Sequence, residues 1–381
     1  MVALTSEKIT TQSSWRWPIA SVAWLFFTMS ILLGSWLARL PEIQAKLQLS
    51  EGTLGLALLG MPLGALLGTQ LASRINAVVT TSKANFYSGL LLCFTVILPP
   101  LAWNFWVFAV ALAIFGFADG WMNVSMNAAA STIEERSGKV IMSSCHGMFS
   151  LGAMIGAASA GFIANWGIPL YWHIPAIAML MGGSLFIFKQ SLFGLPDTPI
   201  TPSKWSLPGR SLVILALIGC FVMIGEGAIA DWGAIYLRKH LDSSLLIASW
   251  GFAAFSLMMA IGRFSGDRIR LMVSGTSLLK WGSILGALGL SMVVFAPSPG
   301  MALVGFMLTG LGFSVVVPIV FSMAAKVDPN NGIATIASVG IVGFLFAPTL
   351  IGVIGELFSL QIAFGLLAVL ALSAAVLSGR S

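Results

Sequence analysis

Three polar side chains recur at four-residue intervals inside an apolar stretch of this sequence: Asp119, Asn123 and Asn127. Residues four apart share one face of a helix, so we expect a carboxyl group in line with two amides. Asp119 lies about 22 Å of helix from Glu134, which puts it deep in the bilayer if the stretch spans a membrane. A carboxyl group at that depth usually faces a cavity or a partner, and desolvation favours its neutral form, so it can load and release a proton. The alternative for the two asparagines is that they only hydrogen-bond between helices.

His146 is the second candidate, and Ser143 and Ser150 share its helix face. A neutral histidine satisfied by a neighbouring helix is the alternative to a proton relay or a solute contact. No second histidine or cysteine stands at ligand spacing, so we expect no metal site. Ser143 and His146 form the only nucleophile–base pair, and it lacks an orienting acid in its own segment, so we do not expect an enzyme.

Glu226, Asp231 and Arg39 complete the candidates for solute or proton binding. Glu226 and Asp231 are separated by about 140° of helical rotation, so they do not share a face of a regular helix. Gly225 and Gly227 flank Glu226 and predict a helix that bends or unwinds there. Arg39 either pairs with one of these acids or extends to the membrane interface.

The segments that must position these residues are strongly apolar. Of the 381 residues 58% are hydrophobic and 8% are charged, whereas about 25% are charged in a typical soluble domain. Apolar runs of about 20 residues match helices that cross about 30 Å of hydrocarbon. The runs are 17–37, 52–72, 84–103, 105–130, 141–164, 172–189, 210–236, 245–264, 277–296, 301–325, 333–356 and 360–378. We therefore predict an all-α membrane protein with twelve transmembrane helices.

A connection rich in proline, serine and threonine at 190–209 divides these spans into six and six. We expect six-helix bundles over 1–189 and 210–381, joined by a cytoplasmic linker. With a cytoplasmic N-terminus, fifteen Lys and Arg residues fall on the cytoplasmic side and four on the other. This bias predicts a multi-pass protein of the cytoplasmic (inner) membrane with both termini in the cytoplasm. It also explains the net charge of +6 without a nucleic-acid partner, because the basic residues form no stripe.

The two halves match each other at an offset of 194 residues, and the matched pairs include Gly68 with Gly262, Arg74 with Arg268, and Glu134 with Asp328. Both halves start on the same side of the membrane, so the repeat is parallel. At this offset Asp119, Asn123 and Asn127 correspond to Phe313, Val317 and Phe321. A site with one polar wall and one apolar wall suits a sugar- or polyol-like solute, or an amphipathic one.

The loop that we expect after span eight, at 262–268, reads Gly-Arg-Phe-Ser-Gly-Asp-Arg. It resembles the Gly-Arg-x-x-x-Asp-Arg loop of the major facilitator superfamily, whose acid and arginine belong to a charge cluster that latches cytoplasmic helix ends when the carrier faces outward. The resemblance implies a gating role for Arg263, Asp267 and Arg268. In the first-half copy it implies the same for Arg74, although Ser73 stands where the acid belongs.

A closer resemblance covers most of the chain and is carried by four stretches, 35–43 with 49–51, 118–127, 146–152 and 226–232. These are similar to the MosC-like branch of that superfamily, which groups with the fucose-permease-like carriers. The resemblance implies the major facilitator fold, with two six-helix halves, and it implies transport without specifying a substrate.

We therefore expect a monomeric secondary active transporter of a small solute, sugar- or polyol-like, that is coupled to protons and works by alternating access. The alternative is a proton-antiporting exporter of drugs or metabolites. Exporters of that type in the superfamily usually carry a Gly-Pro motif in span five, and 141–164 contains no proline. No Walker pattern is present, which argues against ATP as the energy source. We expect no cofactor, and the expected partners are solute, protons and membrane lipid.

Overall fold

The structure, a computed structural model, describes residues 15–195, 209–328 and 332–379. Every regular element in these ranges is a helix, and twelve spans are long and apolar enough to cross a membrane. The prediction of an all-α membrane protein with twelve transmembrane helices in two six-helix halves is confirmed.

The first half contains α1 (Arg16–Leu37), α2 (Leu40–Leu47), α3 (Glu51–Leu58), α4 (Gly60–Val79), α5 (Thr81–Thr95), α6 (Leu98–Leu101), α7 (Phe105–Ser137), α8 (Met142–Asn165) and α9 (Leu170–Phe193). The second half contains α10 (Arg210–His240), α11 (Leu245–Met272), α12 (Gly275–Val294), α13 (Pro299–Phe313), α14 (Val316–Val327), α15 (Gly332–Leu357) and α16 (Leu360–Ser378). One span is formed by α3 with α4, another by α5 with α6, and another by α13 with α14, whereas α2 lies between spans.

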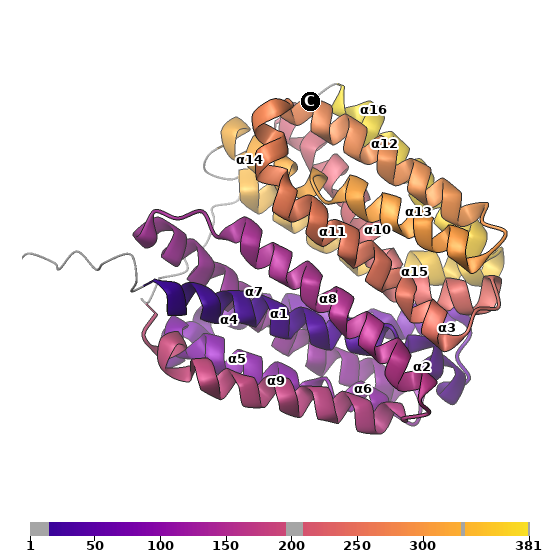
Figure 1. Cartoon of the computed structure of the whole chain (residues 1–381), viewed down its shortest axis with the longest axis horizontal. Helices are drawn as coiled ribbons and strands as arrows, with labels where there is room; N and C mark the ends of the chain where they lie inside the picture. The colour runs from indigo at the N-terminus through magenta and orange to yellow at the C-terminus, as the bar shows by residue number, and fades with distance from the viewer. Residues whose placement is uncertain (1–14, 196–208, 329–331, 380–381) are drawn as a thin grey trace, which may run out of the picture.

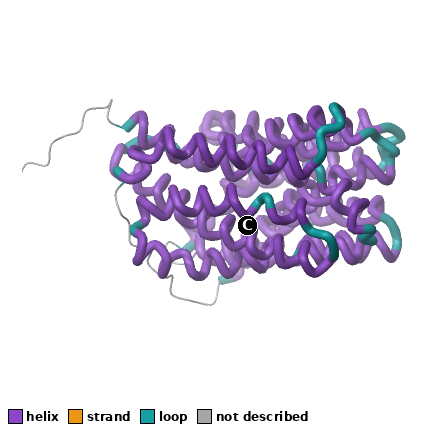
Figure 2. The backbone as a smooth tube through the Cα atoms, turned by 90° about the horizontal axis from the view of Figure 1, so that it is seen from below, coloured by secondary structure: helices purple, strands orange, loops and turns teal. Residues whose placement is uncertain are grey.

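The long helices run roughly along one axis, and the two halves lie side by side across it (Figures 1 and 2). We call the end where α9 stops at Phe193 and α10 starts at Arg210 the linker end, and the opposite end the α2 end. Large apolar side chains, among them Leu67, Val110 and Phe186, are exposed on the outer surface. In water such a surface would aggregate, so it is suited to contact lipid.

Glycines let the helices of the first half approach closely. A Cβ at Gly64 of α4 would collide with the backbone of Ala113 in α7, and a Cβ at Gly116 of α7 would collide with the backbone of Met61 in α4. Gly152 and Gly156 of α8 pack in the same way against α1. In lipid there is no hydrophobic force between helices, so close packing must hold them together, and small residues allow the backbones to approach closely enough for it.

Polar helix ends extend several spans beyond their apolar runs. Helix α7 continues to Ser137 and ends at Gly138, which has a left-handed φ of 66°. The Glu134 carboxylate then accepts hydrogen bonds from the backbone N–H groups of Ile141 and Met142, both at 2.9 Å, which satisfies the start of α8. Helix α11 likewise continues to Met272, so the prediction of a loop at 262–268 was wrong: this segment is helical.

A first joint between the two halves runs along α8 and α11. Near the linker end Gly147 of α8 packs against the ring of Phe264, and near the α2 end Gly161 of α8 packs against Ser249. Phe162 and Trp250 meet edge to face beside this second contact, with ring centroids 5.9 Å apart. Contact at both ends means that α8 and α11 stay together over most of their length.

A second joint lies at the α2 end, between α3 and α15. The Glu356 carboxylate of α15 accepts hydrogen bonds from the Ser50 hydroxyl at 2.7 Å and from the Gly52 N–H at 2.6 Å. Beside it, Lys239 of α10 forms an ion pair with Glu51 at 2.7 Å. Glu356 thus occupies the N-terminus of α3, where free N–H groups and the helix dipole favour a carboxylate.

Candidate functional site

Asp119, Asn123 and Asn127 lie on one face of α7, as the sequence predicts, and we call them the amide face. The Asn127 side-chain amide donates to the Asn123 backbone carbonyl at 2.8 Å and to its side-chain oxygen at 3.2 Å. One carboxyl oxygen of Asp119, Oδ1, is buried with no hydrogen-bond partner among the described residues. The two amides therefore bond within α7, and the carboxyl group of Asp119 keeps an open acceptor.

The amide face points away from the lipid. Ile114, an exposed apolar residue of α7, marks the lipid side of that helix. Asn123 follows it by nine positions, which is about 180° of rotation at about 100° per residue. Asn123 is nonetheless exposed. We infer that it borders accessible space inside the protein, since an amide facing hydrocarbon is costly.

The central charged residues are Glu226 of α10 and Arg263 of α11. The Arg263 Nη2 atom lies 3.7 Å from the Glu226 Oε2 atom, an ion pair that is too long for a hydrogen bond. The Arg263 Nη1 atom donates to the Ser150 hydroxyl of α8 at 2.8 Å, so the arginine reaches across from the second half to the first. We call Ser150, Glu226 and Arg263 the charged cluster.

The charged cluster is incompletely satisfied. Glu226 Oε1 and Arg263 Nε are both buried with no hydrogen-bond partner among the described residues. The two side chains still keep 17% and 13% of their surface accessible, so the pair is not sealed off. A buried polar group without a partner costs about 1–3 kcal/mol, which a ligand that supplies the missing bonds would recover.

His146 of α8 stands beside the charged cluster. Its ring packs edge to face against Phe26 of α1, with centroids 5.2 Å apart. His146 precedes Ser150, the hydrogen-bond partner of Arg263, by one helical turn on α8. The Ser143 hydroxyl donates to the Arg263 backbone carbonyl at 3.2 Å and so is not directed at His146.

Arg39 does not pair with either acid of α10, and both parts of that prediction were wrong. It binds Glu42 with two hydrogen bonds, of 2.6 and 2.8 Å, and donates to the Ile168 carbonyl at 2.9 Å. Only 3% of its side chain is exposed, so it does not extend to the interface. Arg39 pairs instead with Glu42, a carboxylate only three positions away in the sequence.

The prediction was that α10 bends or unwinds at Glu226; the helix is continuous from Arg210 to His240, so it does not unwind there. Gly225 and Gly227 instead give room to Phe313 and Phe344, whose rings occupy the places where a Cβ would stand. Asp231 is half-buried on the same helix, one and a half turns further on.

Of the predicted gating residues, only Arg263 has a described partner that links two helices of the site. Arg74 is exposed at the linker end of α4. Asp267 and Arg268 fall within α11, and their side chains lie outside the described part of the chain. Asn76, near Arg74, is buried and accepts a 2.8 Å hydrogen bond from the Trp121 indole, so it joins α4 to α7.

Sequence reasoning missed the role of Ser150 as a partner of Arg263, and it missed the Glu356 contact with α3. Ser150 offered a signal, since it shares a helix face with His146. Glu356 offered little, because an acid at the end of an apolar run normally indicates only the water interface.

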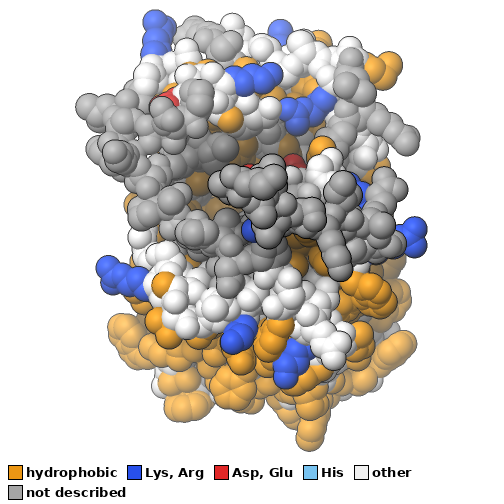
Figure 3. All heavy atoms as spheres, turned by 90° about the vertical axis from the view of Figure 1, so that its left-hand side faces the viewer, with side chains coloured by type: hydrophobic (Ala, Val, Ile, Leu, Met, Phe, Trp, Pro, Cys, Tyr) orange, Lys and Arg blue, Asp and Glu red, His pale blue; other side chains and the backbone are white. Residues whose placement is uncertain are grey.

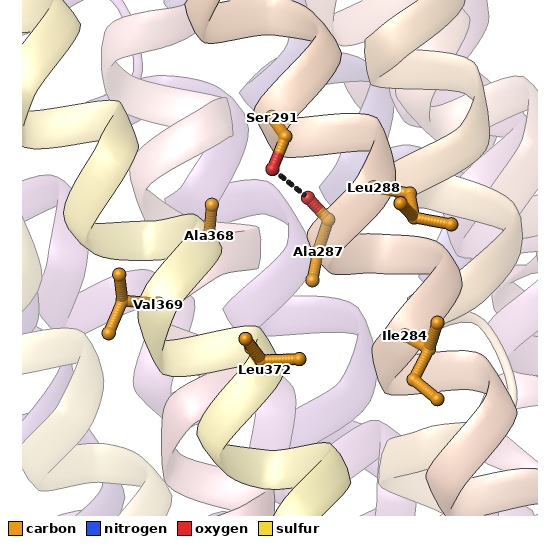
Figure 4. A pocket seen from close by; sticks show the side chains of 7 residues that line it. All are labelled: Ile284, Ala287, Leu288, Ser291, Ala368, Val369 and Leu372. Carbon is orange, nitrogen blue, oxygen red and sulfur yellow. Dashed lines mark hydrogen bonds between the residues drawn. The ribbon is translucent and has the colours of Figure 1, made fainter.

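Two hollows lie away from the charged cluster. A groove of about 210 Å³ between α12 and α16 is lined by apolar side chains and Ser291, whose hydroxyl is already bonded to the Ala287 carbonyl at 2.8 Å (Figure 4). A hollow of about 700 Å³ at the α2 end is lined by residues of α2 and by Arg238, Lys239 and Asp242. In the described residues no group of three His, Cys, Asp or Glu side chains is placed to hold a metal ion.

The charged cluster and the amide face can bind a polar solute by hydrogen bonds and can exchange protons at carboxyl groups. The arrangement draws on both halves, because Ser150 and His146 come from the first and Glu226 and Arg263 from the second. Such a site at the interface of two repeats is where secondary transporters place their solute.

Relatives of known sequence agree with this architecture. The chain is 32% identical over 354 residues to an uncharacterised major-facilitator-type transporter of Yersinia pestis, covering 92% of each chain. It is 31% identical over 346 residues to the membrane protein MosC of Rhizobium meliloti, covering 89% of this chain and 84% of that one. The expected similarity to the MosC-like branch is confirmed.

Solved structures share the fold at low identity. The structure matches a D-xylose–proton symporter with a TM-score of 0.76 at 14% identity, covering 97% of each chain. It matches a mutant form of the nucleoside transporter NupG with a TM-score of 0.71 at 12% identity, covering 95% of this chain and 99% of that one. The profile of the Major Facilitator Superfamily matches residues 19–340. With twelve spans in two halves and relatives above 30% identity along nearly the whole length, this chain belongs to the major facilitator superfamily of transporters.

Proposed function

We propose that this transporter is a proton-coupled secondary carrier of a small, uncharged, hydroxylated solute of the sugar or polyol class, and that it works by alternating access. The observation that carries the proposal is the presence of three acids, Asp119, Glu226 and Asp231, on membrane-spanning helices. Asp119 and Glu226 each keep a buried oxygen with no partner in the described part of the chain.

Energetics favour a proton-carrying role for such acids. An ionised carboxylate at the centre of a membrane helix costs about 2.5–3.5 kcal/mol on insertion scales, so it persists where it has a function. Protonation removes this cost, and alternating exposure to the two sides then couples proton movement to solute movement. We assign proton binding to Asp119, with Glu226 as the alternative acid, and solute contacts to Asn123, Asn127 and His146.

The chemistry of the side chains supports a hydroxylated solute. The amides of α7, the carboxylate of α10 and the guanidinium of α11 offer donors and acceptors that solute hydroxyls can match. Asp231 adds a further acceptor on α10. The D-xylose–proton symporter has the same fold, which is therefore compatible with this combination of solute and ion.

We further propose that the linker end faces the cytoplasm, with the chain in the inner membrane and bundles 1–189 and 210–381 moving against each other. The linker end presents many of the Lys and Arg side chains, as the positive-inside rule requires (Figure 3). Arg74, Asp267 and Arg268 then belong to the cytoplasmic gate. Arg263 belongs to the charged cluster, because its partners are Ser150 and Glu226.

The proposal is tested by solute-induced proton flux. Purified protein is reconstituted into liposomes that contain a pH-sensitive dye, and D-xylose, D-glucose, D-mannitol or myo-inositol is added outside without an imposed gradient. A symporter acidifies the lumen with at least one of these solutes. Alkalinisation would instead indicate antiport, and no pH change with any solute would reject the proposal.

Two neutral variants locate the proton. Asp119→Asn and Glu226→Gln preserve shape but cannot titrate, so either should abolish acidification if its acid carries the proton. Glu135→Gln provides the control, since Glu135 is an exposed acid on the same helix as Asp119. If both Asp119→Asn and Glu226→Gln acidify the lumen as the wild type does, neither acid carries the coupled proton.

A further inference from the structure

The charged cluster leaves a specific set of hydrogen-bonding positions open. The Arg263 Nη1 atom is used by Ser150, whereas Nη2 and the Glu226 Oε2 atom face each other at 3.7 Å without forming a hydrogen bond. The remaining atoms of the pair, Arg263 Nε and Glu226 Oε1, have no partner among the described residues. The open positions are therefore donors on the arginine next to acceptors on the glutamate.

Glu226 and Arg263 lie inside the protein and their side chains keep a small accessible surface, although the unpartnered Oε1 and Nε atoms are themselves buried. Leu217, an exposed apolar residue of α10, lies on the opposite side of that helix from Glu226, which follows it by nine positions, or about 180° of rotation. Glu226 therefore points inward, and the pair retains the accessible surface noted above. Ser150 holds one edge of the guanidinium on the α8 side and so fixes the direction of the others.

Charge balance restricts the ligand. Arg263 and Glu226 carry opposite charges at ion-pair distance, so the cluster is neutral as it stands. A charged ligand would leave one buried charge without compensation, which is strongly unfavourable. A neutral ligand must instead accept from Arg263 and donate to Glu226 at neighbouring points. A hydroxyl both donates and accepts, so a pair of adjacent hydroxyls meets both requirements.

We propose that Glu226 and Arg263, with Ser150 positioning the arginine, form a clamp that recognises two adjacent hydroxyls of a neutral solute. This inference rests on the proposed function and assigns the residues that determine its specificity. The clamp joins α10 and α11 to α8, so a bound diol contacts the second half at the helix pair that joins it to the first.

The test compares the affinities of a solute and its deoxy analogues for the wild type and for variants of the clamp. Binding of D-xylose, D-glucose, D-mannitol and myo-inositol to the purified protein in detergent is measured by calorimetry, and the tightest binder is then compared with its monodeoxy analogues. In the wild type, removal of one hydroxyl of the recognised pair should weaken binding at least about tenfold. Arg263→Lys, which keeps the charge but loses the planar donor fork, should abolish most of that discrimination.

Glu226→Gln serves as the second variant and should lower discrimination against the same analogue. Arg270→Lys is the matched control, because Arg270 lies on the same helix, is exposed and bonds Ser322 at 2.8 Å. It should leave both affinity and discrimination unchanged. A melting temperature within a few degrees of wild type confirms that each variant is folded.

Three outcomes would overturn the clamp: none of the four neutral solutes binds, every deoxy analogue binds as well as its parent, or discrimination survives in a folded Arg263→Lys protein. Because binding is measured without a membrane or gradient, the result is separable from proton coupling. Discrimination without proton flux would reject the coupling and keep the clamp, whereas flux without discrimination would reject the clamp alone.

Discussion

Arg39 shows how a single cation is accommodated in this membrane protein. Its side chain is buried, and its guanidinium is held by two hydrogen bonds to Glu42 and one to the Ile168 carbonyl. The Ile168 bond ties the end of α1 to the turn between α8 and α9. Removing one member of a buried ion pair leaves the other uncompensated, and this is generally more costly than never having had the pair.

We predict that Arg39→Met lowers stability by about 1–3 kcal/mol, because the Ile168 carbonyl loses its donor and the partly exposed Glu42 loses its partner. Thermal unfolding of the purified protein in detergent should show a melting temperature reduced by several degrees. Arg210→Met is the control, since Arg210 is exposed at the start of α10. Equal melting temperatures for the two variants would contradict a structural role for Arg39.

At the scale of helices, contacts between glycines and backbones decide how α4 meets α7. Gly64 and Gly116 each face a backbone carbonyl of the opposite helix and leave no space for a side chain. Backbone cannot rotate away as a flexible side chain can, so the interface tolerates no added volume. Gly183 of α9 differs, because a Cβ there would meet nothing within 4 Å.

We predict opposite effects for the same substitution at these two sites. Gly116→Ala should destabilise the protein by about 1–3 kcal/mol through overpacking. Gly183→Ala should be neutral or stabilising by up to about 1 kcal/mol, because alanine is the better helix former. Thermal unfolding of both variants under identical conditions makes the comparison, and a Gly116→Ala protein as stable as wild type would show that the helices separate more easily than their packing indicates.

The joint between α3 and α15 is the other contact at this scale. Glu356 satisfies the N-terminus of α3, and a Cβ at Gly352 would press on Gly55 and on Trp232. These interactions hold the two halves together at the α2 end. A transporter that opens at this end must break them.

We predict that Glu356→Ala favours opening at the α2 end. Spin labels at Ala45→Cys and Leu357→Cys, both exposed at that end, report the separation of the halves once the three native cysteines are replaced by alanine. Double electron–electron resonance should show a larger population of long distances between the two labels in Glu356→Ala. Glu356→Gln should have a smaller effect, because the side-chain amide oxygen can still accept hydrogen bonds. An unchanged distance distribution in Glu356→Ala would exclude the joint as a determinant of the equilibrium.

For the whole molecule, the distribution of basic residues bears on the proposed orientation. In that orientation fifteen Lys and Arg residues lie on the linker side and four on the other, which is the bias that the positive-inside rule associates with a cytoplasmic face. We predict that Gly209→Cys, at the linker end, resists a membrane-impermeant maleimide in intact cells and reacts after lysis. Trp103→Cys, which is exposed at the α2 end, should react in intact cells. The reverse pattern would invert the topology.

The sequence predicted the number of spans, the halves and the amide face, because apolar length and four-residue spacing are local properties of a helix. It did not predict which charges meet, because that depends on how helices are packed. Arg39 and Glu42 are three residues apart and were not paired, whereas Arg263 was assigned to a gate although its partners lie on α8 and α10. Helix ends were also set too short, since polar residues continue a helix beyond the hydrocarbon, as in α7 and α11.

The long contact between α8 and α11 limits how the halves can move. The contacts at Gly147 and Gly161 are spread along the long axis (Figure 1), so a simple rotation about the line that joins them would open both ends together. Opening at one end at a time instead requires α8 and α11 to rock against each other, with one of these contacts loosening while the other holds. A single crosslink between α3 and α15 should therefore keep the α2 end closed and so arrest the cycle.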